Sequence, residues 1–124
     1  MSNASTVKLE VASSPELARL VRMTAANVAA LSGMSVDRIE DMRMVAEEAF
    51  IFASSIDPDG VLSIAFDVDS DGVSMVFTTG VDSIPALEEG DPAAYADLIL
   101  GAVCDSYEKL ASPVRLLLEV RTDA

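Results

Sequence analysis

The chain has 124 residues, of which 51% are hydrophobic and 23% are charged, so it has the size and composition of one domain with its own core. Its 21 acidic and eight basic residues give a net charge of −13, which disfavours binding to nucleic acid or to anionic membranes. The absence of histidine and the single cysteine, Cys104, exclude an internal disulfide, a thiolate metal site and the commonest general base. We expect a cytoplasmic protein without a metal site.

The charge is distributed unevenly along the chain. Residues 1–56 contain seven acidic and five basic residues, whereas residues 57–124 contain 14 acidic and three basic residues. No Lys or Arg occurs between Arg43 and Lys109. This acidity has two interpretations: it serves only solubility, or it also disfavours a polyanionic ligand near the middle of the chain.

The first half of the chain predicts one strand and two helices. Residues 6–11 alternate between polar and apolar side chains and indicate a strand. A helix is expected to follow, with serine as its cap, Pro15 in its first turn and Gly33 at its end, and Ser35 is expected to cap a second helix. Each helix has a stripe of apolar or small residues: Leu17, Leu20, Val21, Thr24, Val28 and Leu31 in the first, and Ile39, Met42, Ala46, Ala49 and Ala53 in the second.

The second half of the chain predicts a mainly antiparallel sheet. We expect strands at 61–68 and 73–78 joined by a turn, an acidic loop over 79–91, a helix from Pro92 to about Cys104, and strands at 106–110 and 114–121. Short connections between successive strands favour an α/β two-layer sandwich with helices on one face of the sheet. The single domain is expected to span residues 5–122, and residues 1–4 are expected to be an N-terminal tail, for which a cloning origin is one explanation.

The segment from Asp67 to Gly72 has the residue types that begin a calcium-binding helix–loop–helix motif. That motif needs a bidentate Glu at its twelfth position. Here the position is Thr78, inside a predicted strand, and the flanking segments are strands as well. The sequence therefore favours a hairpin turn over a metal site.

Two helical motifs carry a resemblance to a known family. The first predicted helix contains Val21-Arg22, and the second ends in Glu48-Ala49-Phe50-Ile51-Phe52-Ala53. Residues 5–80 resemble the anti-sigma-factor serine kinases, a branch of the ATPases related to histidine kinases and the Hsp90 chaperone. Beyond residue 80 only the order of elements is similar. In that family the second helix ends in Glu-Ala-x-x-Asn-Ala, where Glu is the catalytic base position and Asn holds the magnesium of ATP. The resemblance implies a histidine-kinase-like ATPase fold.

Carried over to this chain, the helical motif is incomplete. Glu48 falls on the base position, and Ala49 and Ala53 match the two small residues. Phe52 stands where the family has its Asn, and a phenyl ring offers no oxygen to magnesium. The simpler structural interpretations are that Glu48 is a solvated or capping acid and that Phe52 belongs to the core.

The remaining ATP motifs of the family are also degenerate. Its Asp-x-Gly-x-Gly motif, whose Asp accepts the adenine amino group, aligns with residues 78–82. There Thr78 replaces the Asp, Gly80 is kept and Asp82 replaces the last Gly. The glycine-rich lid should lie between residues 83 and 101, which contain four acidic residues and no base. Without a ligand, Thr78 and Gly80 are explained as a strand end and a turn.

Two functions of different classes follow from the resemblance. In the first, the chain is a non-catalytic regulator that has lost ATP binding, has no cofactor and controls transcription by sequestering a partner. In the second, it is a serine/threonine protein kinase that binds ATP and magnesium in a divergent pocket. The side chain at position 52 separates them, because the first predicts a pocket closed by Phe52 and the second needs an open polar cleft.

The expected partners also come from the family. The resemblance implies a sigma factor or an antagonist protein as partner, and a homodimer formed through the first strand and first helix. Arg22 lies on the part of the first helix that faces partners in the family, so it is a candidate contact. A solvated helix charge explains Arg22 equally well.

Overall fold

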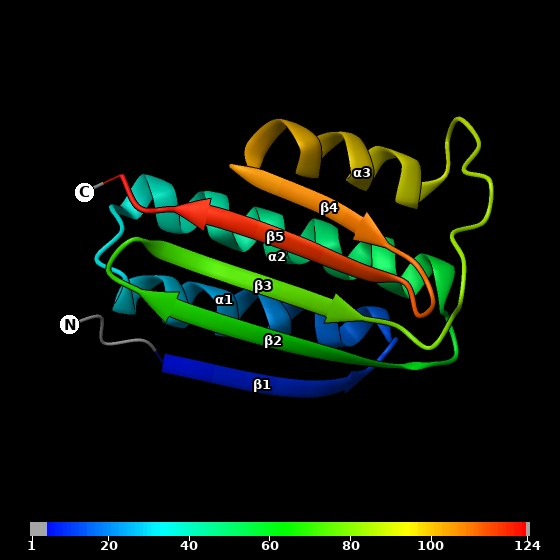
Figure 1. The fold of residues 1–124 in the computed structure, drawn as a ribbon, viewed down its shortest axis with the longest axis horizontal. Coiled ribbons are helices and arrows are strands. Elements are labelled where there is room, and N and C mark those ends of the chain that lie inside the picture. Colours follow the sequence, from blue (N-terminus) through cyan, green and yellow to red (C-terminus); the bar gives the residue numbers. More distant parts are fainter. Residues whose placement is uncertain (1–4, 124) are drawn as a thin grey trace.

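The computed structural model describes residues 5–123, which form a sheet layer and a helix layer (Figure 1). The elements in chain order are β1 (Ser5–Ala12), a 3₁₀ turn η1 (Pro15–Leu17), α1 (Ala18–Leu31), α2 (Val36–Ile56), β2 (Val61–Asp69), β3 (Gly72–Thr78), α3 (Pro92–Val103), β4 (Ser106–Leu110) and β5 (Arg115–Arg121). The predicted order of strands and helices is confirmed.

The sheet has five strands in the order β1-β2-β3-β5-β4, and all neighbouring strands are antiparallel. The helices cover one face of this sheet, and the other face carries no helix (Figure 1). In the helix layer α2 lies between α1 and α3 and contacts both. The α/β two-layer sandwich predicted from the sequence is therefore confirmed.

The core lies between the sheet and the helices. Because side chains alternate between the two faces of a strand, every second strand residue points into this core. In β2, for example, Leu62, Ile64, Phe66 and Val68 are buried, whereas the residues between them are more exposed. On α2 the predicted stripe of small residues is buried, and Met42, Ala46, Ala49 and Ala53 have no exposed surface. Small side chains at this face let the helix backbone approach the sheet closely.

The stripe predicted for α1 is partly wrong. Leu20 and Leu31 are 48% and 67% exposed, so they do not belong to the core. Val21 and Val28 of the predicted stripe are buried, and two alanines that were not predicted, Ala25 and Ala29, complete the buried face of α1. The helix is turned so that its alanines face α2 and the sheet, because small residues allow closer packing between helices than leucines do.

The two predicted serine caps have different outcomes. The Ser35 hydroxyl accepts a hydrogen bond from the Arg38 backbone N–H at 3.2 Å and thereby caps α2 as predicted. Ser14 makes no side-chain cap, because its hydroxyl donates instead to Glu16 at 3.3 Å. The segment after Ser14 begins as the 3₁₀ turn η1, and regular α-helix starts only at Ala18.

The turn between β2 and β3 is a hairpin, as the sequence predicted. Asp69 and Gly72 pair across the two strands, and the Asp71 backbone N–H donates to Asp69 Oδ1 at 2.8 Å. Gly72 has φ of +154°, and a Cβ there would lie 2.5 Å from the Val120 carbonyl oxygen. Across residues 5–123 no group of three or more acidic, Cys or His side chains is placed to hold a metal ion, and no helix has the length and apolarity to cross a membrane.

Arg38 joins the start of α2 to the far end of the sheet. Its guanidinium donates to the Arg121 carbonyl oxygen at 2.8 Å and pairs with Asp105 at 2.6 Å and with Asp41 at 3.1 Å. Only 17% of the Arg38 side chain is exposed. These bonds connect α2, the segment before β4 and the end of β5, so Arg38 links the helix layer to the sheet at this end of the molecule.

Replacing Arg38 is therefore expected to destabilise the fold. Arg38→Ala should lower the free energy of unfolding by about 2 kcal/mol, because charge-assisted hydrogen bonds in a partly buried place are lost. Arg43→Ala is the matched control, since among residues 5–123 Arg43 forms a salt bridge only with Glu40 on the same helix. Its replacement should cost less than about 1 kcal/mol. Urea unfolding followed by circular dichroism measures both, and equal losses would contradict this role for Arg38.

Candidate functional site

The candidate site lies around the second half of α2, which contains Phe52. The Phe52 side chain has no exposed surface. The ammonium group of Lys109, from β4, lies 6.0 Å from the centroid of the Phe52 ring, within the range of a cation–π contact. The position that the sequence resemblance matched to the family's metal ligand is therefore inside the core, beside the positive charge of Lys109.

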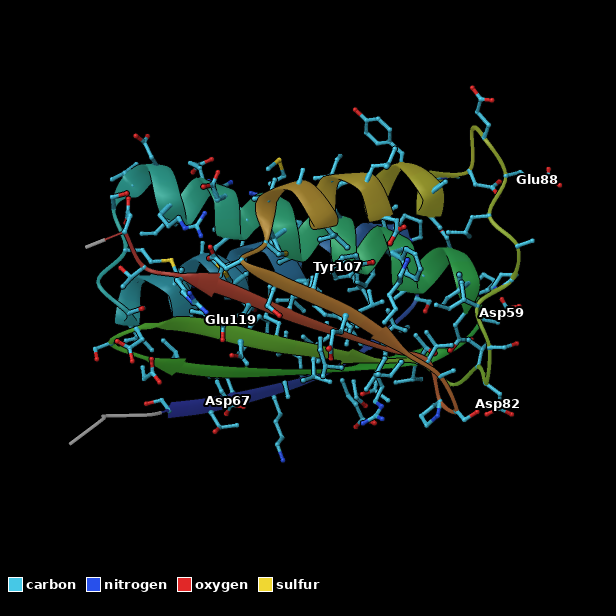
Figure 2. All side chains as sticks on the ribbon, turned by 45° about the horizontal axis from the view of Figure 1, so that its top comes forward. Asp59, Asp67, Asp82, Glu88, Tyr107 and Glu119 are labelled. Carbon is cyan, nitrogen blue, oxygen red and sulfur yellow. The ribbon has the colours of Figure 1, made fainter. Side chains whose placement is uncertain are left out.

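Asp97 on α3 holds this arrangement together. Its Oδ1 accepts hydrogen bonds from the Tyr107 hydroxyl and from Lys109 Nζ, both at 2.7 Å. Tyr107 lies between α3 and the sheet (Figure 2). Burial, the bond to Asp97 and the charge of Asp97 together raise the pKa of Tyr107. We call Asp97, Tyr107 and Lys109 the α3–β4 latch, because these side chains fasten α3 to the edge strand beside Phe52.

Glu48 lies one helical turn before Phe52 and is half-buried. Its pKa is raised, first by burial and then by the charge of the adjacent Glu47. Glu47 itself pairs with Arg22 on α1 at 3.1 Å. A raised pKa suits a general base, but it also follows from a carboxyl group held between packed helices, so both interpretations of Glu48 stay open.

Thr78 lies on the opposite face of the sheet from Phe52. Side chains alternate along β3, and Phe77 is buried against the helices, so Thr78 points to the face that carries no helix. There it lines a shallow depression with residues of β1 and β2, among them Glu10 and Ser63. Thr78 therefore cannot contact a ligand that is held against Phe52.

The segment after β3 is fastened by hydrogen bonds within the chain. The Gly80 backbone N–H donates to Asp57 Oδ2 at 2.8 Å, and the Asp82 carbonyl oxygen accepts from the Ser112 N–H at 2.9 Å. The buried Thr79 bonds through both its N–H and its hydroxyl to the Val114 carbonyl oxygen, each at 3.0 Å. The residues aligned with the family's glycine motif are thus tied to the neighbouring turns.

The predicted lid region consists of an extended loop and α3. Glu88 and Asp91 close a turn, in which the Glu88 N–H donates to Asp91 Oδ2 at 2.8 Å. The Asp91 carbonyl oxygen then accepts the first backbone bonds of α3. Three residues of α3 are buried at its contact with α2: Ala93, Ala96 and Leu100.

Arg22 lies on α1, and its side chain is 29% exposed. Its ion pair with Glu47 connects α1 to α2, so the guanidinium is partly engaged within the chain. A partner would have to share or replace this ion pair. The structure therefore places Arg22 beside Glu47 and Glu48, and separates it from Thr78 by the thickness of the sheet.

The sequence interpretation did not identify Asp57, Asp97 and Lys109, which organise this region. Asp97 gave a usable signal, because it is the one charged residue in the otherwise apolar helix Pro92–Val103. A lone acid in such a helix needs a partner. Lys109 gave a second signal as the first base after a long acidic stretch. Asp57 gave none, since its acceptor role depends on a loop 23 residues away.

Comparison with known proteins gives one relative of known activity. No protein-family model matches the chain. The chain is 30% identical over 86 residues to the serine-protein kinase RsbW of Bacillus subtilis (strain 168), a match that covers 66% of this chain. The chain spans about half of that relative, 54% of its length. This similarity supports the family resemblance of the motifs, and it concerns the family as a whole, not single site residues.

The latch predicts a loss of stability at alkaline pH that depends on Tyr107. The folded chain holds the Tyr107 proton more tightly than the unfolded chain, whose phenol titrates near pH 10. This contribution is present below about pH 10 and is lost as the pH rises above it. In urea unfolding between pH 8 and pH 11, Tyr107→Phe should lose less stability than the unmodified chain, and parallel curves would contradict this role.

Proposed function

We propose that this chain belongs to the anti-sigma-factor serine kinase branch of the histidine-kinase-like ATPases and acts as a regulatory protein-binding module that has lost ATP binding. It controls transcription in the cytoplasm by sequestering a sigma factor or an antagonist protein. The similarity to one serine-protein kinase supports the family alone. We infer the loss of ATP binding from the residues around α2.

The observation that carries the proposal is the burial of Phe52. Magnesium takes oxygen ligands in octahedral geometry, and the Phe52 ring supplies none. The ring has no exposed surface, and Lys109 lies beside it, held in place by Asp97. Binding of magnesium and ATP at this position would require α3 to leave α2 and would expose an apolar ring. The residues present therefore do not fit the magnesium of ATP.

The adenine end of the family's site is also remodelled. Thr78 lies on the far face of the sheet, and Gly80 is bonded to Asp57. A close backbone approach to a ligand needs free N–H groups, and here the Gly80 N–H already donates to Asp57. The charge of the region adds to this, because ATP carries about four negative charges and residues 44–108 contain 14 acids and no base.

The outer side of α1 supports a protein-docking role. Leu20, Met23 and Leu31 are between 44% and 67% exposed there. Arg19 and Arg22 are the sequence neighbours of Leu20 and Met23. Exposed apolar side chains next to arginines are typical of protein interfaces. We assign the partner surface to this part of α1, with Arg22 as a contact.

A homodimer is part of the proposal. Within residues 5–123, β1 pairs only with β2, so one side of β1 is an open edge of the sheet. An open edge next to α1 suits contact between two copies. The interface would avoid the acidic second half of the chain, where two copies repel each other.

The alternative function is an ATP-dependent serine/threonine protein kinase. Two observations favour it: the raised pKa of Glu48 at the base position, and the similarity to a serine-protein kinase. This function requires α3 and the latch to open around the nucleotide and a group other than Phe52 to hold the metal.

Nucleotide binding separates the two functions. Calorimetry with ATP and magnesium on the unmodified protein should give no binding heat, because the metal ligand is missing and the region is acidic. Phe52→Asn should not restore binding and should destabilise the fold by about 3 kcal/mol or more, through lost core volume and a buried amide. Phe52→Leu is the control for volume alone and should cost less. Micromolar binding by the unmodified protein would establish the kinase alternative.

Arg22 gives a test of the partner surface. A pull-down from the native host followed by mass spectrometry identifies the partner, and Arg22→Ala should reduce its recovery. The melting temperature should change little, because a half-exposed ion pair contributes only about 0–1 kcal/mol. Glu47→Ala removes the same ion pair but leaves the arginine, so it serves as the control. Undiminished recovery with Arg22→Ala would remove Arg22 from the interface.

A further inference from the structure

A groove lies where the end of α2 meets the start of α3, and its lining combines apolar residues with Ser55 and Asp91. It has a volume of about 300 Å³. The buried residues Ile56 and Ala93 form its floor, and Pro85, Ala86 and Leu87 of the preceding loop form one wall. We call this the α2–α3 groove. Its size suits one or two apolar side chains from outside the chain.

The apolar surface continues from the groove along α3. Pro92 lines the groove, and Tyr95 and Leu98 follow it at intervals of three residues, so the three lie on one side of the helix. Tyr95 is 67% exposed and Leu98 is 72% exposed. Neither Tyr95 nor Leu98 belongs to the hydrophobic core of the described residues. The groove and the stripe together form an elongated apolar surface of the kind that binds an amphipathic segment.

The surroundings of this surface are acidic. Asp91 lines the groove, and Glu88 and Glu89 are exposed next to it. Figure 2 shows Asp59 and Glu88 at the same end of the molecule, with Asp82 below them. The base nearest to α3, Lys109, is neutralised by Asp97. The rim therefore attracts positively charged residues and repels nucleic acid, anionic lipid and a second copy of this acidic chain.

We propose that the α2–α3 groove docks a basic amphipathic helix of a partner protein. One apolar side chain of that helix fills the groove, the next ones contact Tyr95 and Leu98, and its Lys or Arg residues meet Glu88 and Glu89. This surface is separate from the α1 surface with Arg22. It does not depend on the anti-sigma role, because it rests only on the shape and charge of this end of the molecule.

A synthetic peptide tests the groove directly. The probe is a fluorescein-labelled peptide of 14 residues, with leucines at helical spacing and lysines elsewhere, titrated with the full chain at physiological salt. Saturable binding is expected by fluorescence anisotropy. Glu88→Lys with Glu89→Lys should weaken it about tenfold or more. Asp71→Lys with Glu108→Lys makes the same change in net charge away from the groove and should weaken it less than about threefold.

The apolar part of the surface needs its own variant. Tyr95→Ser with Leu98→Ser should also weaken binding about tenfold, and the exposure of both residues means that the melting temperature should stay nearly unchanged. A peptide with its leucines replaced by serine should bind much more weakly. The proposal is overturned by absent binding, by equal losses in the two charge variants, or by equal affinity for the serine peptide. It is also overturned if Arg22→Ala abolishes binding while the groove variants bind normally.

Discussion

The close packing of α2 between the sheet and the two other helices is the constraint on which the rest of the structure depends. Its small residues, among them Ala46, Ala49 and Ala53, allow the helix to lie directly on the sheet. The same helix supplies Glu48 and Phe52, so the candidate site cannot be rearranged without disturbing the core. Because α3 packs on α2 from the side, Phe52 is enclosed by protein. A change of side chain at this site therefore also changes the packing of the core.

The same packing determines where negative charge stays uncompensated. Most of the bases with an ion pair lie in the helix layer or at its contacts with the sheet, where they pair with nearby acids: Arg22, Arg38, Arg43 and Lys109. Within the described residues no salt bridge reaches the acids of the loop over 79–91. The acids of this loop are thus not neutralised by the bases of the described residues. Such uncompensated negative charge disfavours a polyanion near this loop.

Local patterns in the sequence predicted the helices and strands. The contacts of the candidate site join residues far apart in the sequence, so the sequence did not predict them. Alternation in β2 and the serine cap at Ser35 depend on residues close in sequence, so they were predictable. The buried side of α1 was predictable only in part: Val21 and Val28 follow the helical period, but the choice between leucines and alanines depends on packing against α2. The bond of Asp57 to Gly80 spans 23 residues and leaves no local pattern. The placement of Thr78 was predictable in principle, since alternation from the apolar Phe77 puts it on the opposite face.

The α3–β4 latch holds a positive charge beside Phe52. In an ATP site, a metal ion brings positive charge to the phosphates and is released with the nucleotide. Here the ammonium group of Lys109 lies beside the corresponding position and cannot leave, because it belongs to β4 and is bonded to Asp97. The charge of Lys109 is balanced by the carboxylate of Asp97, although both side chains stay partly exposed. The unpaired acids remain outside, on a loop that borders exposed apolar side chains of α3. A surface of that composition gains most from a partner that brings positive charge and apolar area together.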